Sequence, residues 1–376
     1  MQAVILAAGK GTRMAPLTTP KPLLKVAGRP VVAHTMDALD GFEVIAVVGH
    51  GADQVKAAFG PTVRIVEQPR QAGTFDALLA ARDLLDDRFL VLNGDDLYAR
   101  EDIRACAAKD LALLAAEAPD ASRFGVVDVQ QGKLTITEKP ARPATNLVNT
   151  GLYVLPREIL SAPVQPSIRG ELELVDAVNW LAARHRVAVV RATRWLPIGY
   201  PWDLLRANEV VLPLLKPVQA GEVEPGATLH GPVSVGPGTV IRAGAYIEGP
   251  VVIGSGCVIG PNCFIRPGTA IGDRCKVGNA VEIKNSIIGD RSSVGHLSYI
   301  GDSILGSEVN IGGGTITANL RHDQATVSVR VNGVLVDTSR RKFGAVIGDR
   351  VHTGIHTSIY PGRLLGNDTF PGEIVK

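Results

Sequence analysis

The sequence has few cysteines, almost no net charge and no long apolar run. Its four cysteines include no Cys-x-x-Cys pair, which argues against a disulfide framework and the common zinc modules. A net charge of +2 gives no strong attraction to nucleic acid or membranes. The first apolar run, "AVILAA", precedes Lys10 and Arg13, the wrong order for a signal peptide, and no run could span a bilayer. We therefore expect a cytoplasmic protein with reduced thiols and with neither nucleic acid nor membrane partners.

The chain is too long for one core, so its 376 residues predict two domains. Residues 1–215 alternate short apolar runs such as "QAVILAAG" and "RFLVLNGDD" with amphipathic stretches such as "VVAHTMDALD" and "REDIRACAAK". This alternation predicts a Rossmann-like α/β domain with a mostly parallel sheet and helices on both faces. Ligands of such sheets bind at the carboxyl ends of the strands.

From residue 223 the pattern changes, because aliphatic residues recur every six positions. This period predicts a parallel β-helix of hexapeptide repeats. The spacing shortens to five between Ile283 and Ile288 and between Ile300 and Leu305. The consecutive aliphatic positions are Val223, Leu229, Val235, Ile241, Ile247, Ile253, Ile259, Ile265, Ile271, Val277 and Ile283.

Residues 321–342 leave the hexad pattern and contain "VSVRVNGVLVD", which predicts a projecting hairpin around an Asn-Gly turn. Hexads resume at "AVIGDRVHTGIHTSIYPG". We therefore expect a first domain at 1–215, a linker at 216–222 and a β-helix domain at 223–376 that carries this insertion.

The most informative stretch of the first half is "LAAGKGTRMAPLTTPKPLLKVAGRP". Gly9 and Gly11 would let backbone N–H groups approach phosphate oxygens, and Arg13 and Lys21 supply positive charge. The stretch has neither the Gly-Lys-Ser/Thr of a P-loop nor the Gly-x-Gly-x-x-Gly pattern. Lys25 is either a second phosphate contact or a solvated lysine.

In the second half, polar residues interrupt the hexads within three turns of the prism. An 18-residue turn would place Arg266 and Lys284 directly above one another, and two stacked cations are costly without an anion. The spacing thus favours a phosphate site there, the alternative being a solvated basic edge. The residues concerned are Arg266, Lys284, His296, Tyr299, Asn310 and Asn319.

The first half resembles the sugar-1-phosphate nucleotidylyltransferases through "GKGTRMAPLTTPKP", "EQPRQAGTFDAL", "LNGDD", "ITEKP" and "NTGLY". The resemblance implies that UTP or dTTP reacts with a sugar 1-phosphate, with catalytic Arg13 and Lys21 on the triphosphate and Mg²⁺ on Asp95. It further implies nucleotide contacts from Ala8, Gly9, Gly11, Thr12, Gln68, Gly73 and Thr74, and sugar-phosphate contacts from Gly94, Glu138, Lys139, Asn149 and Gly151.

One departure concerns a second metal ligand, because Pro197 stands where many relatives carry an aspartate in "Trp-x-Asp-x-Gly". Asp203 in "PWD" either replaces that ligand or caps the helix "LLRANEVVL". Asp96 is interpreted as a helix cap or a solvated neighbour rather than a ligand.

The second half resembles the acetyltransferase domain of bifunctional enzymes that acetylate glucosamine 1-phosphate and then uridylylate it. The matching stretches are "RPG", "VGNAVEIKNS", "GHLSYIGD" and "VNIGGGTITAN". The resemblance implies a left-handed β-helix that trimerises, with acetyl-CoA as donor. It makes His296 the general base, a role that suits an imidazole. It assigns Arg266, Lys284 and Tyr299 to the sugar phosphate, Asn310 and Asn319 to the sugar, Glu282 to support and the N–H near Gly313 to the oxyanion.

The 321–342 insertion is longer than in the bacterial enzymes and resembles archaeal-type bifunctional relatives. Arg340, Arg341 and Lys342 in it either contact coenzyme A phosphates or form a solvated rim.

The leading hypothesis is a bifunctional enzyme. The alternative is a glucose-1-phosphate nucleotidylyltransferase whose β-helix serves assembly or regulation, and a non-catalytic scaffold is disfavoured. The sequence does not distinguish uracil from thymine as the base of the nucleotide donor, or glucosamine 1-phosphate from galactosamine 1-phosphate as the acetyl acceptor.

Overall fold

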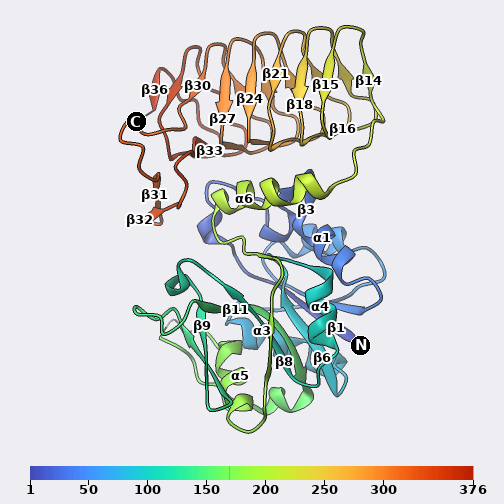
Figure 1. Ribbon diagram of the computed structural model, residues 1–376, viewed down its shortest axis with the longest axis vertical. Coiled ribbons are helices and arrows are strands. Elements are labelled where there is room, and N and C mark those ends of the chain that lie inside the picture. The colour runs from blue at the N-terminus through green and yellow to red at the C-terminus, as the bar shows by residue number, and fades with distance from the viewer. Residues whose placement is uncertain (169, 376) are drawn as a thin grey trace. The chain divides into compact units, whose positions relative to one another are not determined.

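A computed structural model describes residues 1–168 and 170–375. The N-terminal part contains a nine-stranded sheet in the order β10-β9-β11-β6-β1-β4-β5, with β8 beside β11 and β12 beside β8 (Figure 1). Strands β5, β4, β1 and β6 are parallel, whereas β11 runs antiparallel to β6, β8 and β9. The predicted α/β class is confirmed, and its sheet is parallel on one side of β11 and mixed beyond. The strands are β1 (Gln2–Ala7), β4 (Glu43–Val48), β5 (Arg64–Glu67), β6 (Arg88–Asn93), β8 (Ala112–Glu117), β9 (Gly125–Gln130), β10 (Lys133–Glu138), β11 (Leu147–Pro156) and β12 (Ala188–Arg191).

Helices cover both faces of this sheet because side chains alternate along each buried strand. On β1, Val4 packs with helices α3 and α5, while Ala3 and Ile5 pack with α1, α2 and α4. The strand β6 alternates in the same way, with Phe89 on the first face and Leu90 on the second. The helices are α1 (Val31–Ala38), α2 (Ala52–Phe59), α3 (Thr74–Ala80), α4 (Arg100–Ala107), α5 (Leu174–Ala182) and α6 (Pro201–Val211).

The C-terminal part is a parallel β-helix of three sheets, as the hexads predicted (Figure 1). Up to β24 each coil takes 18 residues, as in the pairing of Tyr246 with Phe264, but Glu282 pairs with Tyr299, one residue fewer. The two five-residue spacings in the sequence therefore correspond to shorter coils. The three sheets comprise β14 (Glu222–Val223), β17 (Val240–Ile241), β20 (Val258–Ile259), β23 (Lys276–Val277), β26 (Ser293–Val294) and β29 (Asn310–Ile311); β15 (Thr228–His230), β18 (Tyr246–Glu248), β21 (Phe264–Ile265), β24 (Glu282–Lys284), β27 (Tyr299–Gly301), β30 (Ile316–Thr317), β34 (Ser358–Ile359) and β36 (Ile374–Val375); and β16 (Val233–Val235), β19 (Val251–Ile253), β22 (Thr269–Ile271), β25 (Ile287–Ile288), β28 (Ile304–Leu305), β33 (Ala345–Ile347) and β35 (Arg363–Leu365).

The hairpin expected within 321–342 is present as β31 (Ser328–Val331) and β32 (Val334–Asp337), which pair antiparallel. Asn332 and Gly333 between them both have positive φ, the conformation that a two-residue hairpin turn requires. Around this insertion the β-helix keeps its stacking, because Ile316 in β30 pairs with Ser358 in β34.

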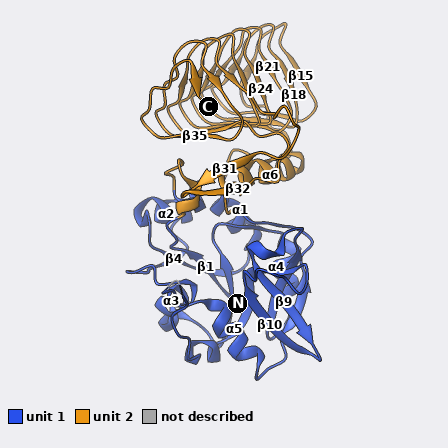
Figure 2. Cartoon of the chain, turned by 90° about the vertical axis from the view of Figure 1, so that its left-hand side faces the viewer, with its two compact units in different colours: residues 1–10, 20–24, 30–197 blue, residues 11–19, 25–29, 198–376 orange. Residues whose placement is uncertain are grey.

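The chain forms two compact units that interleave in sequence (Figure 2). Unit 1 comprises residues 1–10, 20–24 and 30–197, and unit 2 comprises residues 11–19, 25–29 and 198–376. Two pieces of the N-terminal signature thus belong to the same unit as α6 and the β-helix. The sequence-based limits at 215 and 223 stay a prediction.

All four cysteines are free and buried, and burial raises the pKa of Cys106 and Cys263 to about 12.

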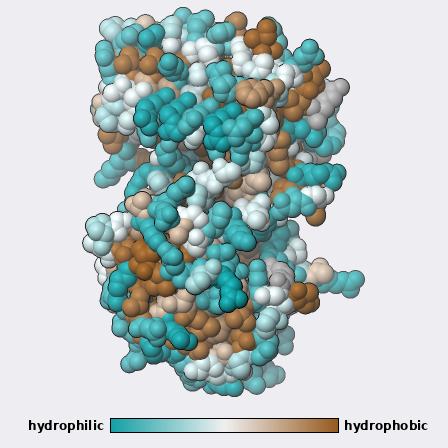
Figure 3. All heavy atoms as spheres, turned by 180° about the vertical axis from the view of Figure 1, so that it is seen from behind, coloured by the Kyte–Doolittle hydropathy of each residue, from teal (hydrophilic) through white to brown (hydrophobic). Residues whose placement is uncertain are grey.

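No helix within residues 1–168 and 170–375 is both long and apolar enough to cross a membrane. On the face seen in Figure 3, hydrophilic side chains are interspersed with smaller apolar groups.

Candidate functional site

Predicted nucleotide, metal and sugar-phosphate contacts of unit 1 lie at one edge of the sheet. Parallel strands end in line there, since Ala7 pairs with Val48 and Val48 with Glu67. Ala8, Gln68 and Asp95 follow β1, β5 and β6, so their loops leave the same edge. Gly94 closes the β6 end by donating its N–H to Leu6 O, 2.9 Å away. A side chain at 94 would crowd Ile5 at 2.8 Å, which explains the glycine.

Lys21 and Asp95 form an ion pair at this edge. The side chain of Lys21 is 11% exposed and that of Asp95 is 31% exposed, so the pair is shielded but reachable. Carboxylate oxygen suits Mg²⁺, which commonly takes one or two protein carboxylates together with phosphate oxygens. Asp95 fits that requirement. The described residues contain no group of three or more His, Cys, Asp or Glu side chains that could hold a metal without substrate.

Asp96 differs from its interpretation as a cap or solvated neighbour. It is buried, and its carboxylate accepts a hydrogen bond of 3.2 Å from Trp195 Nε1. The pairing of β7 (Leu97–Tyr98) with β13 (Trp195–Leu196) brings these residues together. The two residues are 99 positions apart in the chain, so no local sequence pattern predicts this contact.

Gln68 and Gly73 are hydrogen-bonded at the start of α3, where Thr74 Oγ1 accepts a hydrogen bond from Leu174 N at 2.9 Å. The buried amide of Gln68 donates to Gly73 O at 3.1 Å and to Asp76 Oδ2 at 2.7 Å. Gly73 has φ +116°, and a side chain there would collide with the Leu172 backbone. These bonds hold the Gln68 amide in one orientation, which the reading of a base edge needs.

Glu138 ends β10, Lys139 follows it directly, and Asn149 and Gly151 lie on β11. Glu138 and Lys139 form an ion pair of 2.9 Å. Asn149 Oδ1 accepts the Gly151 N–H at 3.0 Å, where the pairing of β11 with β8 shifts register. Gly151 has φ +78°, and a side chain there would strike Asn93.

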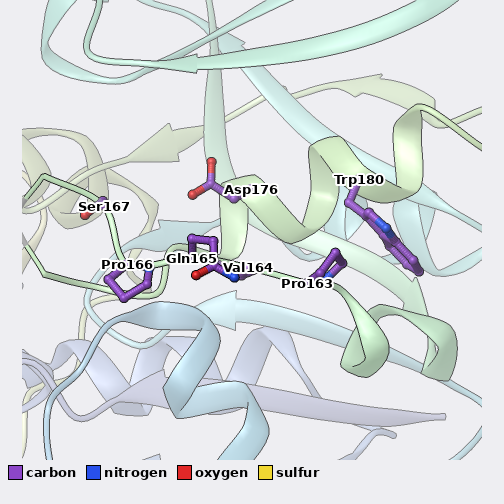
Figure 4. Close-up of a pocket in the computed structure, with 7 residues that line it drawn as sticks. All are labelled: Pro163, Val164, Gln165, Pro166, Ser167, Asp176 and Trp180. Carbon is purple, nitrogen blue, oxygen red and sulfur yellow. The ribbon is translucent and has the colours of Figure 1, made fainter.

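Unit 1 also contains a pocket of about 350 Å³ that the sequence did not predict (Figure 4). Asp176 and Trp180 of α5 line it, facing residues 163–167. Burial raises the pKa of Asp176, and the nearby Glu173 and Glu138 carboxylates raise it further. The pocket therefore lies within electrostatic reach of the predicted sugar contact Glu138.

The glycine-rich signature continues in unit 2. Gly11 has φ +63° and precedes the 3-10 helix Thr12–Met14. The guanidinium of Arg13 lies over the Tyr200 ring, 5.3 Å from its centroid, which is a cation–π contact. The structure thus gives Arg13 an aromatic support that the motif did not indicate.

Asp203 occupies the first turn of α6 and accepts hydrogen bonds from Gly199 N at 2.9 Å and Tyr200 N at 2.8 Å. This is the capping role left open from the sequence. The metal role of Asp203 stays a prediction.

We expect Asp203→Ala to lower the free energy of unfolding by about 1 kcal/mol, since two backbone N–H groups lose their acceptor. Asp203→Asn keeps an oxygen at that position and should restore most of the stability. Urea denaturation measures both variants. If Asp203→Asn is as stable as the native chain but needs more Mg²⁺ for half-maximal pyrophosphate release, Asp203 is a ligand as well as a cap. Equal stability of all three proteins would contradict the capping role.

One face of the β-helix brings together the predicted acceptor residues. Arg266 lies above Lys284, since Arg266 N donates to Ile283 O at 2.8 Å. Each cation already has a carboxylate partner: Arg266 pairs with Glu282 at 2.8 Å and Lys284 with Asp302 at 3.3 Å. The stacked cations therefore do not require the external anion that the sequence spacing had suggested, although each can still donate to a phosphate.

Tyr299 and Asn319 complete this face. Asn319 Nδ2 donates to the Tyr299 hydroxyl at 3.1 Å and to Asp302 Oδ2 at 2.6 Å. Burial raises the pKa of Tyr299, and the Asp302 and Glu282 charges raise it further. The phenol therefore stays protonated and can donate a hydrogen bond.

His296 lies at the corner between β26 and β27 and is exposed. Its Nε2 is 2.5 Å from the position that a Cβ on Gly313 would take, so the imidazole rests against a glycine backbone. Asn310 begins β29, the next strand above β26. The predicted base, its neighbouring glycine and this amide thus lie on adjacent coils.

Two basic residues at the end of the insertion, Arg340 and Lys342, have different surroundings. Arg340 pairs with Glu209 of α6 and is largely buried, which favours a structural role for it. Lys342 is exposed, and its proposed contact with acetyl-CoA stays a prediction.

Comparison with known proteins covers both halves. The family model described as "Nucleotidyl transferase" matches residues 2–212. "Bifunctional protein GlmU" of Methanocaldococcus jannaschii is 37% identical over 99% of this chain and 93% of its own. The "Bifunctional sugar-1-phosphate nucleotidylyltransferase/acetyltransferase" of Sulfurisphaera tokodaii is 36% identical over 100% and 97%. The chain belongs to this bifunctional nucleotidylyltransferase/acetyltransferase family.

Other matches are partial. The family model "GMPPB C-terminal domain" matches residues 247–369. A solved structure, a putative glucose-1-phosphate thymidylyltransferase from Bacillus anthracis in complex with a sucrose, is 30% identical with a TM-score of 0.50. It covers 56% of this chain and 94% of its own. The full-length matches therefore distinguish the bifunctional family from single-function thymidylyltransferases.

Within this bifunctional nucleotidylyltransferase/acetyltransferase, sequence reasoning missed Asp302. The residue is buried and accepts hydrogen bonds from Asn285, Lys284 and Asn319. It thereby joins two predicted acceptor contacts from different coils. Its position in "YIGDS" follows an ordinary hexad glycine, so only its burial in the folded chain marks it.

Proposed function

We propose that the β-helix transfers an acetyl group from acetyl-CoA to glucosamine 1-phosphate and that the sheet domain then joins the product to a nucleotide. The nucleotide donor is UTP or dTTP with Mg²⁺, and pyrophosphate is released. The proposed products are UDP-N-acetylglucosamine and related nucleotide sugars. The observation that supports this most is the presence in one chain of the Lys21–Asp95 pair and the His296 face.

In the acetyl step, the sugar amine attacks the thioester carbonyl carbon. His296 takes the proton that the nitrogen loses, the carbon–sulfur bond breaks, and the coenzyme leaves as a thiolate that takes up a proton. Negative charge gathers on the thioester oxygen in the transition state, so an N–H donor near Gly313 would lower the barrier. Arg266, Lys284 and Tyr299 hold the sugar phosphate, while Asn310 and Asn319 hold the sugar.

In the nucleotidyl step, an oxygen of the sugar phosphate attacks the α-phosphorus in line, and the bond to the β-phosphate breaks. Charge accumulates on phosphate oxygens, so catalysis consists of positioning and cations. Lys21 and Arg13 supply positive charge, and Asp95 would hold Mg²⁺, which neutralises the triphosphate. Gln68 reads the base, and Glu138 with Asn149 orients the sugar.

The base of the nucleotide donor is uracil or thymine. A "Glucose-1-phosphate thymidylyltransferase" of Streptomyces griseus is 33% identical over 64% of this chain, so dTTP stands beside UTP as donor. Uracil and thymine present the same hydrogen-bonding edge to Gln68. The four cysteines are free and buried, and we propose that both reactions take place in the cytoplasm, where thiols stay reduced.

A substrate panel tests the proposed function. Glucosamine 1-phosphate and galactosamine 1-phosphate are each offered with acetyl-CoA, and the acetylated and free sugar phosphates are then offered with UTP and dTTP. Product masses identify each transfer. Nucleotide sugar formation without any acetylated product would favour the alternative, a single-function enzyme with a β-helix used for assembly.

We also propose a homotrimer formed through the β-helix. Apolar side chains point outward from one of its sheets, with Tyr246 and Ile316 each 43% exposed and the Tyr246 and Phe264 rings in edge-to-face contact. A copy packed on this face would remove that apolar surface from water. Sedimentation equilibrium should therefore return three times the chain mass, and a monomer would contradict the proposal.

A further inference from the structure

We propose that the β-helix is a positioning element for nucleotidyl transfer, acting through the pieces of the glycine-rich signature that pack on it within unit 2. The inference rests on the role proposed above for Arg13 and on the nucleotide contacts expected of Gly11 and Thr12. It goes beyond that role, because it makes one half-reaction depend on residues of the other half. Unit 2 comprises residues 11–19 and 25–29 together with α6 and the β-helix. Four contacts join the two short segments to α6 and the β-helix.

The first contact is an aromatic column that ends under Arg13. The Tyr200 and Trp202 rings stack with centroids 4.6 Å apart, and Trp202 meets Phe343 edge to face at 6.0 Å. Trp202 and Phe343 are fully buried. Phe343 lies in the β-helix segment that follows the hairpin, and its N–H donates to Asn319 O at 2.9 Å. The support beneath Arg13 is therefore fixed by the β-helix.

The second contact is an ion pair between Lys25 and the Asp290 corner of the β-helix. Lys25 Nζ donates to both carboxylate oxygens of Asp290, at 2.8 and 2.9 Å, and lies 3.6 Å from Asp273. Burial alone would raise the pKa of Asp290, but the bonds from Lys25 and from Asp273 N–H outweigh it and the pKa is lowered. Asp290 is therefore charged at neutral pH and holds Lys25.

The third and fourth contacts are hydrogen bonds made by Thr18 and by Asn208. Thr18 Oγ1 donates to Asp349 Oδ2 at 2.8 Å. Asn208 of α6 is completely buried, accepts Ala27 N at 2.8 Å, and donates to Gly268 O of the β-helix at 2.6 Å. Both pieces of the signature are thus tied to coils far apart in sequence.

These contacts meet a requirement of the signature itself. Glycines at 9 and 11 leave the loop without intrinsic stiffness, because glycine loses more conformational freedom on ordering than other residues. Catalytic groups must be held close to their productive geometry, and a misplacement of about 1 Å can cost about a hundredfold in rate. An external anchor on the rigid coils supplies that order.

Two single variants and their combination test the proposal. Lys25→Met removes the ammonium, and Asp290→Asn removes the charge but keeps an oxygen for Asp273 N–H. Each should raise the KM for the nucleoside triphosphate about tenfold and leave the kcat and KM of acetyl transfer unchanged. The double variant should be no worse than either single, because both remove the same contact.

Lys56→Met is the matched control, since it breaks the exposed Lys56–Glu67 pair of unit 1 and should leave both activities at native values. Native KM in both Lys25→Met and Asp290→Asn overturns the proposal. An effect of Lys25→Met without one of Asp290→Asn also overturns it, because Lys25 then contacts phosphate directly. If the unaltered chain releases no pyrophosphate from any donor, the proposed function fails instead.

Discussion

Replacing His296 by alanine is expected to abolish acetyl transfer to the sugar amine while pyrophosphate release continues at the native rate. A positioned general base contributes about 10²- to 10⁴-fold, and the loss in kcat should fall in that range. His296 is exposed at a corner of the β-helix, so its removal leaves the buried core of the coils intact. Coenzyme A release, followed with a thiol reagent, measures the effect.

Gly313→Ala provides an independent test of the same assignment. The added methyl group would lie 2.5 Å from His296 Nε2, so the imidazole must move while its chemistry is retained. We expect a loss approaching that of His296→Ala. His230→Ala is the control, because His230 is an exposed histidine on β15 of the same β-helix. Native acetyl transfer in His296→Ala, or loss of both activities in it, would contradict the two-site assignment.

Replacing Lys21 by methionine should have the opposite result, with pyrophosphate release reduced by about 10²- to 10³-fold and acetyl transfer unchanged. Removal of one preorganised donor to a developing oxyanion costs about this much. The loss has a second cause here, because the part-buried carboxylate of Asp95 loses its cation. Pyrophosphate release, coupled to a phosphatase, measures it.

Lys109→Met is the matched control, since Lys109 is exposed in the same unit and lies outside the predicted site. A full rate of pyrophosphate release in Lys21→Met would remove Lys21 from the site. Loss of both activities would instead indicate that the variant is misfolded.

The sequence predicted the parts of the fold that repeat or alternate. The aliphatic hexads identify the β-helix because each coil repeats the same inward position, and even the shorter coils are visible as five-residue spacings. Helices α1 and α4 lie within the two amphipathic stretches identified from the sequence. The antiparallel direction of β11 was not predicted, since a buried strand has the same pattern in either direction.

The site could be predicted only where a motif is local. Lys21 and Asp95 come from motifs that family resemblance identifies, although their ion pair joins residues 74 apart. Asp302, the column beneath Arg13 and the Lys25–Asp290 pair could not be predicted, because each depends on contacts between distant segments. The Lys25–Asp290 contact spans 265 residues, and no periodicity relates its partners.

The hairpin insertion has a practical consequence for protein engineering. Outside it the coils continue undisturbed. The chain takes 42 residues from Ile316 to its partner Ser358 on the next coil, whereas the earlier step from Tyr246 to Phe264 in the same sheet takes 18. Extra length is therefore absorbed between two stacked coils. The exposed tip at Asn332–Gly333 is therefore a suitable insertion site for a foreign epitope, an affinity tag or a fluorescent reporter in the active transferase.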